Sequence, residues 1–278
     1  MIPAPFDYEV AESVGHALTL LGERKDAKLL AGGHSLLPVL RLRVARPSLL
    51  VDVGRLEELS YIRERGDTLA IGALTRHHDL ATSPIVQEHN PLVWYAAGLI
   101  GDPQVRHRGT IGGSLAHGDP ASDLPAVVLA LDGEVDVTGA DGVRTVAARD
   151  FFRGVFETAA GPGEMVTEVR VPKLTEDHVW SYLKFRRRAQ DWATVGVAAL
   201  ARRSNGGVAD PAIALVNMGA TPLRAAQAEA AWAASAADPG ANADEGTEPQ
   251  SDTNASAEFR RHLVRVLVRR AVEEAEHR

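Results

Sequence analysis

The sequence contains no cysteine among its 278 residues. This absence excludes disulfide bonds, cysteine nucleophiles, thiolate metal sites and iron–sulfur clusters ligated by the chain itself. Uncharged apolar runs are also short, and none reaches the ~18 residues that a membrane-spanning helix needs. The N-terminus lacks a basic run followed by an apolar run, so we expect no signal peptide. The default expectation is a cytoplasmic protein, with any association with the inner membrane face made through partners.

Basic residues are in the minority, with 30 Lys and Arg against 37 Asp and Glu and a formal net charge of −7. No overall positive field is available to attract nucleic acid, and we expect no nucleic-acid partner. Hydrophobic residues make up 45% of the chain and charged residues 24%, which excludes a disordered, collagen-like or coiled-coil protein. At ~150 residues per domain, the length suggests about two domains.

Periodicity predicts helices alternating with strands in the first two thirds of the chain. Val14, Ala17, Leu18 and Leu21 form one apolar helix face, and Ser13 is a suitable N-cap. A glycine-rich polar stretch runs over 109–125. Further helices are expected over 74–81, 91–100 and 126–131, and strands over 28–31, 48–53, 59–63, 68–71, 134–138, 143–146 and 164–171.

The last third predicts consecutive strands over 179–187, 194–203 and 212–218, with Asn205-Gly206-Gly207 as a hairpin signal. Helices are expected over 223–234 and from Phe259 onward. The segment 236–255 is rich in small and polar residues and is predicted to be a mobile surface loop. A group of arginines on the last helix predicts a solvated face, with a partner-docking surface as the alternative: Arg260, Arg261, Arg265, Arg269 and Arg270.

Two glycine-rich loops carry the clearest functional signal. They are Ala31-Gly32-Gly33-His34-Ser35 and Thr110-Ile111-Gly112-Gly113-Ser114. Glycine lacks a Cβ atom, so its backbone N–H groups can approach an anion closely, and the serine hydroxyl adds a donor. Two such loops, about eighty residues apart, could close on the two phosphates of one pyrophosphate. The alternative is that the glycine pairs only mark turns.

Neither G-x-G-x-x-G nor G-x-x-x-x-G-K-[ST] occurs, so Rossmann and P-loop phosphate binding are not supported. The second loop runs into 116–125, where a carboxylate could accept hydrogen bonds from the sugar hydroxyls of a nucleotide. Two other interpretations of this stretch stay open. His117, Asp119 and Asp123 are hard, metal-type ligands at short spacing, and the Asp and Pro residues could simply build turns.

The sequence resembles the FAD-binding medium subunits of the molybdenum hydroxylases, in the xanthine dehydrogenase superfamily, and most closely the type found in aerobic carbon monoxide dehydrogenase. The resemblance covers nearly the whole chain except 236–255. Four stretches carry it in this order: 30–38 (LAGGHSLLP), 71–75 (IGALT), 102–125 (with DPQVR, GTIGG and DLP) and 184–194 (with KFRR and DWAT).

The resemblance implies an α+β fold with two domains. Residues 1–177 would form an α/β-type FAD-binding domain of the PCMH/VAO type in two lobes, about 1–55 and 56–177. Residues 178–278 would form a smaller C-terminal domain of three antiparallel strands plus helices. The strands and the hairpin expected from the residues alone agree with this arrangement.

The resemblance also implies roles for individual residues. Asp123 matches a carboxylate expected to bond the ribityl chain. Lys184 matches a lysine expected near the pyrimidine edge of the isoalloxazine ring, where a cation favours the negative charge of the reduced flavin. The FAD pyrophosphate would be cradled, chiefly by main-chain N–H groups, by Ala31, Gly32, Gly33, His34 and Ser35 and by Thr110, Ile111, Gly112, Gly113 and Ser114.

The resemblance places Trp192 where this type of subunit has an aromatic residue near the flavin ring, often tyrosine. A tryptophan can still stack on the ring, but it puts any role of a tyrosine hydroxyl in doubt. The alternatives are that Trp192 is a core residue and Lys184 an ordinary charge on a strand face. Some flavin oxidases of the same broad fold attach FAD through a histidine placed like His34. The family resembled here has the same histidine and binds FAD non-covalently, which we expect for this chain. His77, His78 and His107 are interpreted as surface or core histidines.

The implied function is electron transfer within an oxidoreductase complex. FAD on this chain would accept electrons from [2Fe–2S] clusters on a small partner subunit and pass them to an external acceptor, quinone or NAD. A large partner subunit would carry molybdopterin and select the substrate: carbon monoxide, a purine, an aldehyde or an N-heterocycle. We expect a dimer of heterotrimers, and no catalytic residue or metal ligand on this chain.

Two alternatives from other classes remain. One is a metal-dependent hydrolase that uses His117, Asp119 and Asp123. The other is a scaffold subunit that has lost its flavin.

Overall fold

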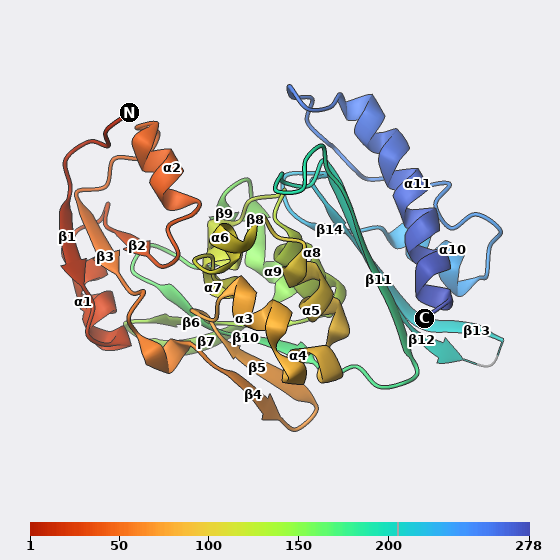
Figure 1. Cartoon of the computed structure of the whole chain (residues 1–278), viewed down its shortest axis with the longest axis horizontal. Helices are drawn as coiled ribbons and strands as arrows, with labels where there is room; N and C mark the ends of the chain where they lie inside the picture. The colour runs from red at the N-terminus through yellow and green to blue at the C-terminus, as the bar shows by residue number, and fades with distance from the viewer. Residues whose placement is uncertain (205) are drawn as a thin grey trace.

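The N-terminal residues form a small α/β unit at one end of the molecule (Figure 1). The computed structural model describes residues 1–204 and 206–278. The Ser13 side chain caps the first helix by accepting a hydrogen bond from the His16 N–H, as predicted. The unit is a parallel sheet in the order β1-β3-β2 with two helices, namely β1 (Asp7–Val10), α1 (Val14–Glu23), β2 (Lys28–Leu30), α2 (Leu36–Arg41) and β3 (Leu49–Asp52).

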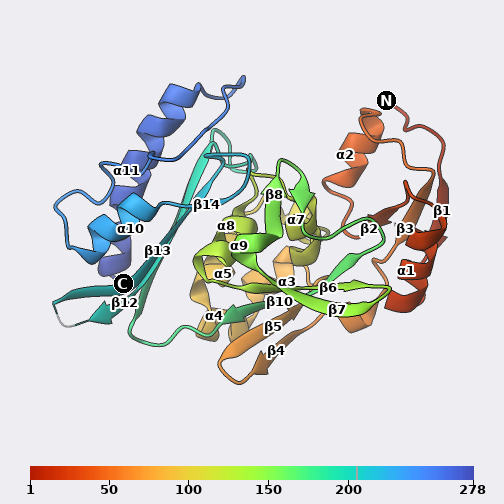
Figure 2. The same cartoon turned by 180° about the vertical axis from the view of Figure 1, so that it is seen from behind.

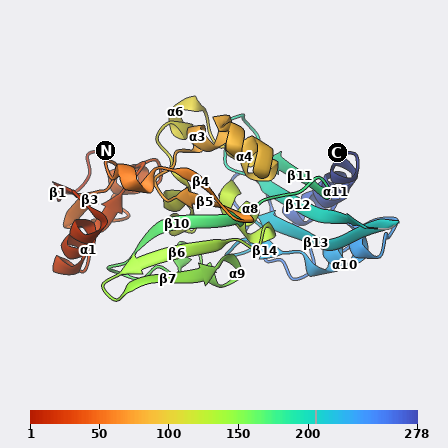
Figure 3. The ribbon, with the colours of Figure 1, turned by 90° about the horizontal axis from the view of Figure 1, so that it is seen from below.

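The middle of the chain forms a five-stranded antiparallel sheet in the order β4-β5-β10-β6-β7, which Figure 3 shows from below. Val169 and Val171 of its central strand are buried in the main core with residues of the neighbouring helices. The strands are β4 (Ile62–Arg65), β5 (Thr68–Gly72), β6 (Glu134–Gly139), β7 (Gly142–Ala147) and β10 (Met165–Pro172), and a small hairpin of β8 (Phe152–Gly154) and β9 (Glu157–Thr158) lies before β10.

Short helices come before β4 and in the connections between the later strands, and those in the connections supply many of the apolar side chains that pack on the middle sheet. They are η1 (Glu57–Leu59), α3 (His77–Thr82), α4 (Pro84–His89), α5 (Pro91–Gly98), α6 (Pro103–Arg106), α7 (Ile111–His117), α8 (Asp123–Ala130) and α9 (Ala148–Phe151). Among the described residues, no helix is both long and apolar enough to cross a membrane.

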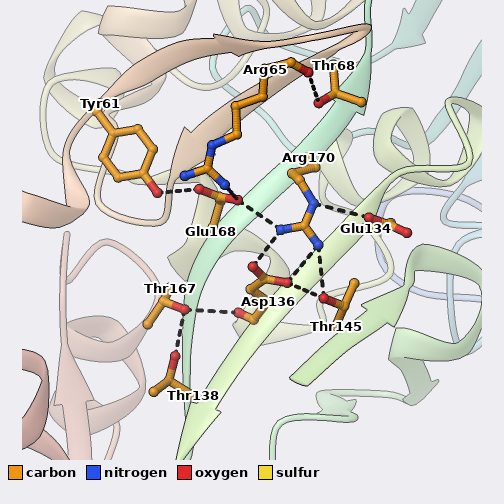
Figure 4. A network of polar contacts seen from close by, with 10 residues as sticks. All are labelled: Tyr61, Arg65, Thr68, Glu134, Asp136, Thr138, Thr145, Thr167, Glu168 and Arg170. Carbon is orange, nitrogen blue, oxygen red and sulfur yellow. Dashed lines mark hydrogen bonds and ion pairs between the residues drawn. The ribbon is translucent and has the colours of Figure 1, made fainter. Parts of the chain in front are cut away.

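A polar network ties strands of the middle sheet together (Figure 4). The buried Glu168 accepts hydrogen bonds from the Tyr61 hydroxyl at 2.5 Å, from Arg65 at 3.0 Å and from Arg170 at 2.9 Å. Arg170 also binds both carboxylate oxygens of Asp136, at 2.6 and 2.8 Å. Burial and the bond to Glu168 raise the pKa of Tyr61 to about 12. The carboxylates of this network are paired with arginines of the same sheet, so we interpret the network as structural.

The C-terminal sheet is covered on both faces (Figure 2). Residues 195–201 are buried without alternation, because α10 and α11 pack on one face and α5 and α8 on the other. The strands pair antiparallel in chain order, and the elements are β11 (His178–Phe185), β12 (Val195–Ser204), β13 (Gly207–Val216), β14 (Leu223–Arg224), α10 (Ala226–Ala233) and α11 (Ala257–Glu276).

Several local predictions differ from the structure. The polar stretch 109–125 contains α7 and the start of α8, because Thr110 caps α7 by accepting the Gly113 N–H. A fourth short strand, β14, occupies the beginning of the helix predicted over 223–234, since Leu223–Arg224 pairs with β13. The helix predicted over 74–81 begins at His77. Asn205 of the hairpin signal lies outside the described residues, whereas β12 and β13 pair antiparallel as predicted.

The segment 236–255 contains no helix or strand, and its mobility stays a prediction. It packs along α11, where Arg265 binds Asp244 and Arg269 binds Asp238, each through two nitrogen atoms. Arg260 of the same helix is only 2% exposed. The prediction of a solvated arginine face is therefore wrong for Arg260, because tertiary contacts outweigh its intrinsic preference for water.

Candidate functional site

The structure brings the two glycine-rich loops into contact. A Cβ atom on Gly32 would overlap the carbonyl oxygen of Arg108 and would lie 2.9 Å from the Cα of Gly109. A Cβ atom on Gly113 would lie 4.0 Å from the Cβ of Ala31. The backbone of the first loop therefore lies directly against residues 108–109, which lead into the second loop, and only glycine at position 32 permits this approach.

The first loop offers free main-chain donors. The N–H groups of Gly32, Gly33, His34 and Ser35 have no protein acceptor within the described residues. Gly33 adopts a left-handed φ of 77°, which favours glycine there. The exposed His34 ring lies with Nδ1 3.2 Å from the Gly32 carbonyl oxygen. Consecutive free N–H groups in such a turn form a concavity suited to an anion.

The second loop contributes differently from the expectation. It forms the first turn of α7, and the N–H donors of residues 111–114 are already used within the protein. The N–H groups of Ile111 and Gly112 donate to the carbonyl oxygens of Thr75 and Ala73, at 3.1 and 2.9 Å. Thr110 Oγ1 accepts from Gly113 at 3.1 Å, so its own hydroxyl proton stays available. In the second loop, the available donor is thus the Thr110 hydroxyl, whereas the free main-chain N–H groups lie in the first loop.

Basic side chains surround the meeting point of the loops. His77, the first residue of α3, is buried, and its Nδ1 has no hydrogen-bond partner within the described residues. Burial, followed by the charges of Arg76, Arg106 and His34, lowers the pKa of His77 to about 3, so the ring is neutral at pH 7. Arg76 donates to the carbonyl oxygen of Arg108. Positive charge next to free N–H groups favours a ligand with negative charge.

Asp123 and Lys184 form a buried pair. Lys184 Nζ donates to Asp123 Oδ2 at 2.8 Å and to the carbonyl oxygen of Leu99 at 3.2 Å. The Tyr182 hydroxyl donates to Asp123 Oδ1 at 2.5 Å. Burial raises the pKa of Asp123, and the opposing effects of Lys184 and Tyr182 do not cancel it. Lys184 is thus the buried partner of a carboxylate, and not the ordinary charge on a strand face that we weighed as an alternative.

Tyr182 was missed by the sequence reasoning. Arg186, which belongs to the KFRR stretch that carries the resemblance, donates to Leu99 O at 2.9 Å. The available signal for Tyr182 was alternation, because residues 182 and 184 of one strand point to the same side. Trp192 lies in the connection between β11 and β12 and is 53% exposed. The alternative that it is a core residue is therefore wrong.

The structure also shows the surroundings of the other histidines named above and of the residues considered as metal ligands. His77 is a core residue, and His78 stacks on His107 with ring centroids 3.9 Å apart. His117 packs against an aromatic ring, while Asp119 accepts an N–H in its own turn and Asp123 is committed to Lys184 and Tyr182. Among the described residues, no group of three His, Asp or Glu side chains could hold a metal ion. The stretch 117–123 therefore builds turns and helix ends, and the hydrolase alternative lacks a site.

Comparisons with known proteins agree with this geometry. The model of the FAD binding domain in molybdopterin dehydrogenase matches residues 4–174, and that of the CO dehydrogenase flavoprotein C-terminal domain matches residues 180–275. The carbon monoxide dehydrogenase medium chain of Hydrogenophaga pseudoflava is 49% identical over 81% of this chain and 78% of its own length. The 6-hydroxypseudooxynicotine dehydrogenase complex subunit alpha of Paenarthrobacter nicotinovorans is 41% identical over 100% of this chain and 97% of its own.

Among solved structures, a chain of carbon monoxide dehydrogenase from Hydrogenophaga pseudoflava superposes with a TM-score of 0.96 at 45% identity, covering 100% of this chain and 99% of the other. The α+β fold, with a flavin-binding domain followed by a C-terminal strand domain, is thereby confirmed. The protein is an oxidoreductase flavoprotein subunit, and FAD is the cofactor of its family. The chain belongs to the FAD-binding medium subunits of the molybdenum hydroxylases, the family of the carbon monoxide dehydrogenase medium chain.

Proposed function

We propose that this chain is the FAD-carrying electron-transfer subunit of a multi-subunit molybdenum hydroxylase. Electrons would arrive one at a time from [2Fe–2S] clusters on a small partner subunit and leave to an external acceptor, a quinone or NAD. The large subunit would hold molybdopterin and act on the substrate. The observation that carries the proposal is the contact between two glycine loops, one of which offers consecutive free N–H groups. Zero cysteines support placing the clusters on another chain.

The residues present fit FAD. The pyrophosphate would lie on the N–H groups of 32–35, facing the hydroxyls of Thr110 and Ser114, with His34 beside it. When bound, FAD supplies a carrier that stores two electrons and can exchange them singly. The task of the protein is then to bind, orient and shield the cofactor, and no side chain of this subunit needs to act as an acid or base.

The proposed roles of Asp123 and Lys184 are compatible with their pairing. An ammonium has three donors, and Lys184 uses two of them, on Asp123 and on Leu99 O. Each carboxylate oxygen of Asp123 accepts one protein bond and keeps a second lone pair for a ribityl hydroxyl. Because Asp123 neutralises Lys184, the field at the flavin would be that of an ion pair, weaker than that of an isolated cation. Trp192 would stack on the ring, and its exposure leaves its faces available.

The complex is proposed to be a dimer of heterotrimers in the cytoplasm. Carbon monoxide, a purine, an aldehyde or an N-heterocycle are all compatible substrates, since the substrate would be chosen on the large subunit. Relatives at 49% and 41% identity are named for quite different substrates, which supports assigning this choice outside the medium chain.

The test is to purify the chain together with the large and small subunits expressed beside it. We expect a flavin spectrum, with the pigment released as FAD by acid precipitation. A complex that is assembled but free of flavin would establish the scaffold alternative. Pigment that stays with the precipitated chain, and that is lost in His34→Ala, would establish covalent attachment instead. Assays of the complex with each substrate class, and with quinone and NAD, then identify the donor and the acceptor.

A further inference from the structure

The segment that carries Trp192 is held by two side chains of the C-terminal domain. Asn217 Nδ2 donates to the carbonyl oxygen of Ala193 at 2.7 Å and to that of Thr194 at 3.4 Å. Arg260 Nη1 donates to the same oxygen of Thr194. The two peptide carbonyls that follow Trp192 are therefore held by donors from the end of β13 and from the start of α11.

Asn217 also reaches the other side of the candidate flavin site. Its N–H donates to the carbonyl oxygen of Pro120 at 2.8 Å, in the turn that leads to Asp123. Asn217 has a left-handed φ of 62°, which asparagine tolerates better than most residues. In this conformation its backbone bonds the turn before Asp123 while its side chain bonds the segment after Trp192.

Arg260 is fixed in turn by the segment 236–255. Its Nη2 donates to Asp252 Oδ2 at 2.7 Å, and Asp252 Oδ1 accepts the N–H groups of Asn254 and Ala255 at 2.7 and 2.9 Å. Burial raises the pKa of Asp252, but these backbone bonds and Arg260 outweigh it and hold the pKa below its ordinary value. Asp252 is thus the charged partner of an arginine that is 2% exposed.

Trp192 itself has little packing to hold it in place. Its side chain is 53% exposed, so burial contributes only part of what a core tryptophan would gain. The restraint on its position must come from the backbone of its own segment. That backbone is bonded by Asn217 and Arg260 on the carbonyls of residues 193 and 194, and the Thr194 N–H donates to the carbonyl oxygen of Phe185 at 2.8 Å.

We propose that Asn217 and Arg260 are positioning residues for the flavin, which fix Trp192 relative to the turn before Asp123. This inference rests on the proposed function. It also assigns a role to the segment 236–255, because Asp252 of that segment fixes Arg260 through an ion pair. Loss of either donor would leave Trp192 on a loose connection between β11 and β12, and FAD would be held less tightly.

The test uses the complex with its partner subunits and two variants. Asn217→Gly keeps the left-handed backbone and removes the amide, and Arg260→Lys keeps the charge but cannot bond Thr194 and Asp252 through a planar fork. We expect each to release FAD about tenfold faster, the effect of one lost hydrogen bond. We also expect altered visible circular dichroism of the flavin and faster amide exchange over 191–195.

The matched control is Arg265→Lys. Arg265 lies on the same helix and binds the same segment through Asp244, with two bonds of 2.6 Å, but it does not contact residues 193 and 194. It should leave FAD release and flavin dichroism unchanged. Equally fast FAD release in Arg265→Lys would mean that general loosening of the domain causes the effect, and this result would overturn the inference. Where Arg260→Lys fails to fold, Asp252→Asn gives the same test.

A second variant series asks whether the effect passes through Trp192. Trp192→Ala should accelerate FAD release, and adding Asn217→Gly in that background should change the rate little further. Full additivity of the two substitutions would contradict the inference, as would faster exchange over 191–195 in Asn217→Gly with unchanged FAD release. A wild-type complex without FAD would instead refute the proposed function, so the two failures are distinguishable.

Discussion

Lys184 and Asp123 are joined by an ion pair of 2.8 Å between Nζ and Oδ2, with only 2% and 3% of their side chains exposed. The pair links the end of β11, an edge strand of the C-terminal sheet, to the first residue of α8, and so couples the two domains next to the candidate flavin site. Each charge is the counter-ion of the other. Removal of one alone leaves a buried charge without a partner, which is far costlier than removal of both.

Asp123→Asn is therefore expected to lower the free energy of unfolding by about 3 kcal/mol. The double variant Asp123→Asn/Lys184→Met should recover most of that loss, because it removes the stranded ammonium. Urea denaturation of the chain, followed by circular dichroism, measures both. A single variant as stable as the wild type would show that the pair does not hold the domains.

The same double variant tests the ribityl role of Asp123. It should be folded, and its complex should nevertheless release FAD faster than the wild type if the carboxylate bonds the cofactor. Equal FAD affinity would count against that role and leave Asp123 with a structural one. Asp119→Asn is the control, since within the described residues the Asp119 side chain accepts only an N–H of its own turn and lies outside the pair.

Gly32→Ala is expected to separate the two loops. The added methyl group would overlap Arg108 O and approach Gly109 Cα to 2.9 Å, both of which are backbone atoms that cannot rotate away. We expect a loss of about 2 kcal/mol in stability and a fall in FAD retention by the complex of tenfold or more. Gly22→Ala is the matched control, because a methyl group there meets no atom within 4 Å and stabilises a helix slightly. Full FAD retention in Gly32→Ala would contradict the proposed contact.

The glycine loops could be predicted because their signal is local. A glycine pair before a hydroxyl residue permits a close backbone approach, and Gly32 makes such an approach to Arg108. The donors of the second loop could not be predicted from the same pattern. Thr110 stands three residues before Gly113, the spacing of an N-cap, and this capping bond together with the carbonyls of residues 73 and 75 takes up the N–H groups.

The pairing of Asp123 with Lys184 lies beyond what periodicity can show. The two residues are 61 positions apart and meet only because β11 passes the start of α8. Likewise, the sequence predicts Arg260 as a surface arginine on an amphipathic helix. Only the fold shows that Thr194 and Asp252 accept hydrogen bonds from its guanidinium group. Long-range polar contacts of this kind depend on which helices and strands pack together in the fold. Helix starts and strand alternation depend on residues close together in the sequence, so they can be predicted from it.

Glu168→Gln is expected to destabilise the middle sheet without affecting the cofactor. Glu168 is 5% exposed and accepts from Tyr61, Arg65 and Arg170, so the neutral amide would leave two cations less compensated. We expect a loss of about 2 kcal/mol in the free energy of unfolding. Glu64→Gln, which removes a half-exposed partner of Lys173, should cost less than about 1 kcal/mol. Loss of FAD from the complex in Glu168→Gln would place the network in the flavin site and contradict a purely structural role.

His77 gives the chain a defined dependence of stability on pH. Burial lowers its pKa to about 3, from an ordinary value of 6.5 in the unfolded chain. Because the unfolded state binds the proton first as the pH falls, this contribution to stability is complete above about pH 6.5 and is lost progressively down to about pH 3. Between pH 7 and pH 5 the loss amounts to about 2 kcal/mol.

His77→Leu should flatten this dependence. The Nδ1 atom of His77 has no partner within the described residues, so an apolar side chain of similar size leaves no donor or acceptor stranded. Urea denaturation at pH 7 and pH 5 should therefore show a difference in unfolding free energy about 2 kcal/mol smaller in His77→Leu than in the wild type. His262→Gln, on the exposed side of α11, should keep the wild-type difference. An unchanged difference in His77→Leu would mean that the ring at the meeting point of the two loops takes up its proton without resistance from burial.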